Sequence, residues 1–195
     1  MFVAFFGLTL VGLLTGHWWF LIGYGAFMVV LFPAIEFKVL CSRCPYYSKC
    51  GKKVVCFSGS GVPKTYKSNL RPMTKAGHAV MYSYYTFTIG FPIVILSYAV
   101  YYTAHRYEHF GLIALMGIIG LLVAQILTFL AFNYCLGVYV CRRCPNFSCP
   151  WNGVKKPVVD EYLRMNPEMR KKWEETGYVL GDGKELDDYI EKTKP

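Results

Sequence analysis

Three long stretches of the chain carry no formal charge, and they limit what the chain can fold into. They are residues 1–35, 76–105 and 109–141. Each is long enough to cross a membrane, because a spanning helix needs only about 20 apolar residues. Of all residues, 54% are hydrophobic and only 17% are charged, which is more apolar than a usual soluble domain. The sequence therefore predicts an all-α integral membrane protein.

The first stretch is too long for one straight helix of membrane thickness. A helix of that length would extend roughly 50 Å, against a hydrocarbon core of about 30 Å. Gly16, between Thr15 and His17, indicates a hairpin at this point. We therefore expect four transmembrane helices, near residues 2–15, 17–39, 80–104 and 110–139.

Basic residues are concentrated between the second and third expected spans, and no acidic residue follows Glu36 in that segment. The nine are Lys38, Arg43, Lys49, Lys52, Lys53, Lys64, Lys67, Arg71 and Lys75. Lys and Arg are enriched in cytoplasmic loops, so we expect this loop on the cytoplasmic side of the cell (inner) membrane. Two further crossings return the chain to the same side, together with the C-terminus.

The charge pattern also bears on the start of the chain and on its partners. The first basic residue is Lys38, so the charged start of a cleaved signal peptide is missing and we expect the first span to be retained. The basic loop is expected to attract anionic lipid in the bilayer. We expect no nucleic-acid partner, because the tyrosines lie largely in or near the spans and form no stacking platform in the loop.

Two segments of the chain share a cysteine motif. Residues 41–48 (CSRCPYYS) and 141–148 (CRRCPNFS) agree at five of eight positions. Each copy follows a pair of expected spans, which predicts two parallel two-helix repeats related by an axis along the membrane normal. The expected domains are a first repeat (1–60), a basic cytoplasmic linker (61–79), a second repeat (80–157) and a soluble helical tail (158–195). In the tail, Asn166-Pro167-Glu168 predicts a helix start.

All eight cysteines fall into two sets of four. The first set is Cys41, Cys44, Cys50 and Cys56, and the second is Cys135, Cys141, Cys144 and Cys149. Four thiolates can bind a zinc ion or an iron–sulfur cluster. Disulfides are the alternative, but they belong to oxidising compartments. If Cys135 is only a small apolar residue at the end of a span, the second set would recruit Cys50 or Cys56, and the two sets would merge into one site.

The residues beside the cysteines bear on which metal is bound. Proline follows Cys44, Cys144 and Cys149, and a Cys-Pro pair also closes the cysteine run of bacterial ferredoxins. Zinc ribbons more often carry two C-x2-C pairs, whereas each set here has one. Iron–sulfur clusters are therefore the favoured prediction, with zinc as the alternative.

Three arginines and three histidines suggest two further cofactor roles. Arg43, Arg142 and Arg143 would offset the negative charge of a cluster and raise its reduction potential, or they act only as positive-inside anchors. A haem held by His17 with His105 or His109 is disfavoured, because histidines at the ends of spans commonly act as interfacial anchors.

These patterns lead to a functional hypothesis. The chain is expected to be a membrane-anchored electron-transfer or anchor subunit of a redox complex, with metal clusters at the cytoplasmic face and a partner subunit or soluble redox protein docked there. The alternatives are a zinc-stabilised membrane scaffold and a membrane thiol-disulfide redox enzyme. The sequence contains no G-x-G-x-x-G, G-x-x-x-x-G-K-S/T or G-x-S-x-G motif, which favours a redox subunit over a stand-alone enzyme.

Overall fold

The computed structural model describes residues 2–48, 51–56, 61, 63–183 and 189. Helix makes up 74% of the structure and no strand occurs in the described part of the chain, which confirms the all-α class. The α-helices are α1 (Phe2–Thr15), α2 (Trp19–Ala26), α3 (Phe32–Ile35), α4 (Pro45–Ser48), α5 (Lys75–His105), α6 (Tyr107–Cys135), α7 (Lys156–Met165) and α8 (Pro167–Glu174).

The chain divides into two compact units, each built from two separate stretches. The first, here called the helix unit, comprises Met1–Ala34 and Tyr82–Cys135. The second, here called the cysteine unit, comprises Ile35–Met81 and Leu136–Pro195. Both CxRCP motifs and the tail helices α7 and α8 belong to the cysteine unit.

Three continuous helices are long and apolar enough to cross a bilayer. They are Trp19–Arg43, Lys75–His105 and Tyr107–Arg143. Large apolar side chains on them are exposed, including Val29 at 76% and Ile113 at 90%, as expected of surfaces that contact lipid. These helices fit a membrane protein.

The number of spans differs from the expectation at the N-terminus. Helix α1 has 14 residues and is therefore about 21 Å long, shorter than a hydrocarbon core of about 30 Å. It ends where predicted, because Gly16 adopts a left-handed conformation with φ of 75° that terminates helices. The structure thus supports three spans, and the fourth stays a prediction.

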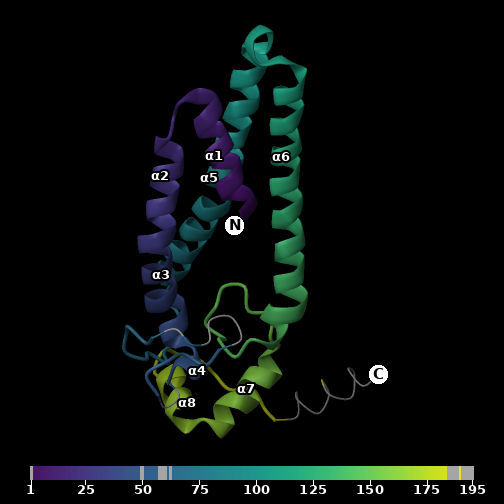
Figure 1. Cartoon of the computed structure of the whole chain (residues 1–195). Coiled ribbons are helices and arrows are strands. Elements are labelled where there is room, and N and C mark those ends of the chain that lie inside the picture. Colours follow the sequence, from purple (N-terminus) through teal and green to yellow (C-terminus); the bar gives the residue numbers. More distant parts are fainter. Residues whose placement is uncertain (1, 49–50, 57–60, 62, 184–188, 190–195) are drawn as a thin grey trace. The chain divides into compact units, whose positions relative to one another are not determined.

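Figure 1 shows the helices α1, α2, α5 and α6 of the helix unit. Apolar side chains from these helices form the core of this unit. Leu8 and Leu96 are completely buried in it. Gly7 allows close packing there, since a Cβ at this position would lie 3.1 Å from Leu96 Cδ2. On α6, Asn133 accepts a hydrogen bond from Tyr85 of α5, which is the interhelical bonding typical of polar residues within spans.

A tyrosine from α2 replaces the backbone hydrogen bond that a proline removes from α5. Pro92 has no N–H, so the carbonyl of Thr88, four residues earlier, loses its helical donor. The hydroxyl of Tyr24 donates to that carbonyl at 2.9 Å. The Tyr24 ring stacks on Phe91 at 5.6 Å between centroids. This contact satisfies a backbone group that lipid could not.

Replacing Tyr24 with phenylalanine is expected to lower the stability of the helix unit by about 0.5–1.5 kcal/mol. The ring remains, and only the donor to Thr88 is lost. The measurement is unfolding by SDS in mixed micelles. Tyr101→Phe, on an exposed face of α5, is the matched control and should leave stability unchanged. Equal loss in both variants would contradict the specific role of the Tyr24 hydroxyl.

The tail helices pack together around a tryptophan in the cysteine unit. Trp173 is buried with Val159, Leu163 and Met169, and its indole Nε1 donates to the carbonyl of Leu70 at 3.0 Å. Helix α8 begins at Pro167, as predicted. The side chain of Asn166, expected to cap α8, instead donates to Tyr162 O near the end of α7.

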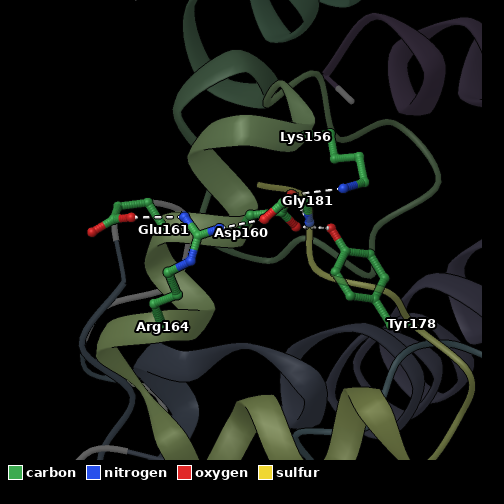
Figure 2. A network of polar contacts seen from close by, with 6 residues as sticks. All are labelled: Lys156, Asp160, Glu161, Arg164, Tyr178 and Gly181. Atoms are coloured by element: carbon green, nitrogen blue, oxygen red, sulfur yellow. Dashed lines mark hydrogen bonds and ion pairs between the residues drawn. The ribbon is translucent and has the colours of Figure 1, made fainter. Parts of the chain in front are cut away.

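A buried carboxylate fastens the segment after α8 to α7 (Figure 2). Asp160 accepts hydrogen bonds from Lys156 Nζ at 2.6 Å, from Tyr178 Oη at 2.7 Å and from Gly181 N at 2.9 Å. Arg164 donates to the carbonyl of Gly181 as well and pairs with Glu161 at 3.1 Å. The described part of the tail is therefore folded back on α7.

Candidate thiolate centre

Both cysteine motifs follow the same succession of backbone conformations. A π-helical turn (Glu36–Leu40 or Leu136–Val140) leads into a 3-10 turn (Cys41–Arg43 or Cys141–Arg143). The chain then becomes extended at Cys44, with φ −79° and ψ 135°, and at Cys144, with φ −79° and ψ 123°. π-Helical turns within helices often mark functional sites.

The first motif closes the end of its own helix. The last carbonyls of a helix lack intrahelical donors, and here side chains supply them. Ser42 Oγ donates to Lys38 O at 2.6 Å, and Arg43 Nε donates to Val39 O at 3.1 Å. Arg43 Nη1 also donates to the carbonyl of Pro72 at 2.9 Å. Arg43 thus holds backbone carbonyls of two segments in place, a role that the sequence did not indicate.

Each cysteine that is followed by proline sits at a corner, here called a Cys-Pro corner, where the N–H group two residues later donates to its thiol. These N–H groups belong to Tyr46 for Cys44, to Asn146 for Cys144 and to Trp151 for Cys149. The N–H of Tyr47 donates to the carbonyl of Cys44 at 2.9 Å, and that of Asn152 donates to the carbonyl of Cys149 at 3.0 Å. The donors to sulfur favour the thiolate over the neutral thiol.

The three cysteines of the first set that the structure describes share one apolar cluster. Cys44 is 7% exposed and packs with Tyr47 and Val54, and Cys41 and Cys56 pack against them. Tyr47 also accepts a hydrogen bond at its hydroxyl from Tyr66 N, at 3.0 Å. The backbone at Tyr66 is thereby held against Tyr47.

Burial and mutual repulsion of thiolates dominate the electrostatics of the site. Burial, together with the neighbouring thiols of Cys144 and Cys56, raises the pKa of Cys44 to about 11, although backbone N–H groups act to lower it. Burial likewise raises the pKa of Cys149 to about 11, with contributions from Cys144 and Cys141. The pKa of Cys144 is also raised, by burial and then by Cys56 and Cys141. These thiols are therefore protonated at neutral pH.

The structure brings some of the predicted ligands together and leaves others apart. Cys41, Cys44, Cys56, Cys141, Cys144 and Cys149 interact electrostatically within the cysteine unit. Cys135 belongs to the helix unit and is exposed. Five residues, Leu136–Val140, separate it from Cys141, and its role as a ligand stays a prediction. Cys50 lies outside the described residues.

The other candidate cofactor residues are mostly at the surface. Arg142 and Arg143 are exposed, and Arg43 is half-buried because of its backbone contacts. Their proposed effect on a cluster stays a prediction. The three histidines considered for haem, His17, His105 and His109, are all exposed.

None of the cysteines in the described part of the chain forms a disulfide. Within that part of the chain, no group of three or more His, Cys, Asp or Glu side chains lies at the spacing of metal ligands. A zinc–sulfur bond is about 2.3 Å long, so the protonated thiols would have to rotate inward on binding. Binding would also release the thiol protons, because a metal binds the thiolate form.

Two asparagines matter to the site and carried no clear signal in the sequence. Asn152 Nδ2 donates to Cys144 O at 2.7 Å and to Asn146 O at 3.1 Å. Asn146 Nδ2 donates to Leu40 O at 2.9 Å. Asn146 lies within the second motif and Asn152 lies four residues after it, and this nearness to the cysteines is the one signal that could have found them.

Comparison of the chain with protein-family models, curated proteins and solved structures found no match. The functional argument therefore rests on the geometry of the cysteine unit.

Proposed function

We propose that the chain is a membrane-anchored electron-transfer subunit that binds an iron–sulfur cluster, or clusters, through thiolates of the two CxRCP motifs. The observation that supports this proposal most is the set of three Cys-Pro corners, in which backbone N–H groups donate to the thiols of Cys44, Cys144 and Cys149. Hydrogen bonds to ligand sulfurs stabilise the thiolate form and tune the reduction potential of a cluster.

The membrane part would hold the centre at one face of the bilayer. The shared backbone geometry of the two motifs supports the interpretation of the chain as two parallel repeats. The basic residues between Lys38 and Lys75 support a cytoplasmic position for both motifs. There the centre would exchange electrons with a soluble redox protein or a partner subunit.

The raised thiol pKa values count against a thiol-disulfide enzyme. With a pKa of about 11, Cys44 and Cys149 would be ionised in only about one molecule in 10⁴ at pH 7. The thiolate is the form that attacks a disulfide, so these thiols would react slowly. A metal ion instead displaces the protons and binds the thiolates.

Anaerobic purification of the full chain, followed by metal and sulfide analysis and a visible spectrum, tests the proposal. We expect iron and acid-labile sulfide, with absorbance that dithionite bleaches. The double substitution Cys41→Ser/Cys44→Ser should remove the iron, and Cys135→Ser is the control that should retain it. Metal-free protein whose cysteines cycle between thiol and disulfide would overturn the proposal.

Zinc is the second candidate, and one observation favours it. Trp173 of the tail contacts Phe147 of the second motif and donates to Leu70 in the segment before α5, an arrangement that a purely structural ion would stabilise. In that case the chain would be a zinc-stabilised scaffold. Stoichiometric zinc in colourless protein, purified under the same anaerobic conditions, would establish this alternative and exclude electron transfer by a cluster.

A further inference from the structure

Asn146 ties the second cysteine motif to the helix end that carries the first. Its side chain is 5% exposed, and its Nδ2 donates to the carbonyl of Leu40 at 2.9 Å. Leu40 immediately precedes Cys41. The backbone N–H of the same asparagine donates to the thiol of Cys144. One residue therefore holds Cys144 and, through its side chain, contacts the backbone next to Cys41.

Further contacts fix Cys144 on its other side. Asn152 donates to the carbonyl of Cys144 at 2.7 Å, and Gly153 N donates to the carbonyl of Cys141 at 2.9 Å. The chain after the second motif thus folds back on the motif. Cys144 is held by backbone and side-chain bonds that belong to the cysteine unit alone.

The described thiols of the first set, Cys41, Cys44 and Cys56, lie together in the apolar cluster around Tyr47. Cys144 joins this group electrostatically. Within the set Cys41, Cys44, Cys56 and Cys144, every thiol interacts with every other. Cys144 is among the thiols with the largest effects on Cys41 and Cys44, whereas Cys149 is not.

We propose that Cys144 is the fourth ligand of a single metal centre whose other ligands are Cys41, Cys44 and Cys56. The centre therefore takes three thiolates from the first cysteine set and one from the second, an inference that rests on the proposed function. Asn146 is its positioning residue. Cys141 and Cys149 lie beside the centre and are not required to hold it.

Reconstitution of the detergent-solubilised full chain with Co²⁺ tests this ligand set without depending on iron chemistry. The probe is the sulfur-to-cobalt charge-transfer band, whose intensity reports how many thiolates bind. Single serine substitutions at Cys144 and Cys149 form a matched pair, because both thiols sit at Cys-Pro corners. We expect Cys144→Ser to lose one thiolate from the spectrum and Cys149→Ser to keep the wild-type spectrum.

The outcomes separate this inference from the proposed function. Wild-type protein that binds neither Co²⁺ nor iron overturns both. Normal binding by the wild type, with the thiolate lost in Cys149→Ser or Cys50→Ser and not in Cys144→Ser, overturns the ligand set and leaves the metal-binding function standing. Gel filtration of each variant shows whether it folds, and a variant that aggregates is replaced by the corresponding alanine variant.

The role of Asn146 has its own readout. Loss of a group that orients a metal ligand typically lowers metal affinity 10–100-fold, so Asn146→Ala should weaken Co²⁺ binding by that factor and shift the charge-transfer band. Asn166→Ala is the matched control, because Asn166 Nδ2 also donates to a helix-end carbonyl, that of Tyr162 at 2.8 Å. Equal effects of the two substitutions would reduce Asn146 to a structural role and contradict the inference.

Discussion

Replacing Trp173 with alanine is expected to destabilise the cysteine unit by about 3–5 kcal/mol, the usual cost of deleting a buried aromatic side chain. Trp173 is 5% exposed, contacts Phe147 and Tyr178, and donates to the carbonyl of Leu70. Its loss would leave a cavity and an unpaired carbonyl. Phe147 lies within the second motif, so the damage should extend to the segment that carries Cys144 and Cys149.

Hydrogen exchange of the purified protein, read by mass spectrometry, is the measurement. Peptides from α7, α8 and the segment around Leu70 should exchange faster in Trp173→Ala. Trp173→Phe keeps most of the packing and should cost only about 1 kcal/mol, the value of one hydrogen bond. Trp19→Ala, at a position that is 79% exposed, should change nothing in these peptides. Unchanged exchange in Trp173→Ala would show that the tail does not depend on this residue.

Replacing Asp160 with asparagine is expected to release the segment Tyr178–Gly181 from α7 at neutral pH. The Asp160 side chain is only 3% exposed, and three donors surround it (Figure 2). Burial alone would raise the pKa of this carboxyl, but the donors from Lys156, Tyr178 and Gly181 together lower it below its usual value. Hydrogen bonds to a charged group contribute about 1.5–3 kcal/mol, and we expect a loss of that order.

The sign of the pH dependence follows from the lowered pKa. A carboxyl whose pKa is lower in the folded protein stabilises it above the unfolded pKa of about 3.9, and this stability is lost as the pH falls through the folded value. In the wild type, protection of residues 178–183 from proteolysis should therefore decline only below about pH 4. Asp160→Asn should show weak protection at every pH, and Glu174→Gln, on an exposed pair with Arg170, should behave like the wild type. A wild-type loss of protection near pH 6 would contradict this role.

The long helices and their ends could be predicted from the sequence because apolar runs and single glycines decide them locally. α5 and α6 cover the expected third and fourth spans, and Gly16 ends α1 at the expected place. The sequence also indicated the hairpin at Gly16, but whether α1 crosses the bilayer stays a prediction, because its 14 residues span less than a hydrocarbon core. The start of α8 at Pro167 was likewise readable, since proline fits the first turn of a helix.

The candidate site was less predictable because its contacts join residues far apart in the chain. The motif spacing indicated the cysteines, but nothing in it showed that Asn146 reaches Leu40, 106 positions earlier. The π-helical turns before both motifs also lack a sequence signal, since they depend on how the helix end is held. Arg43 shows the same limit. The sequence suggested that its positive charge would offset that of a cluster. In the structure, its N–H groups donate to the carbonyls of Val39 and Pro72.

The Cys-Pro corners have a consequence for how the two motifs can diverge. The groups that act on each thiol are backbone N–H groups, and every residue except proline supplies one. The side chains at these positions are consequently free to serve other purposes. They are tyrosine at 46, asparagine at 146 and tryptophan at 151, and Asn146 uses this freedom to contact the other motif. Duplicated motifs of this kind can keep the same chemistry at sulfur while neighbouring side chains change, as those at positions 46 and 146 do.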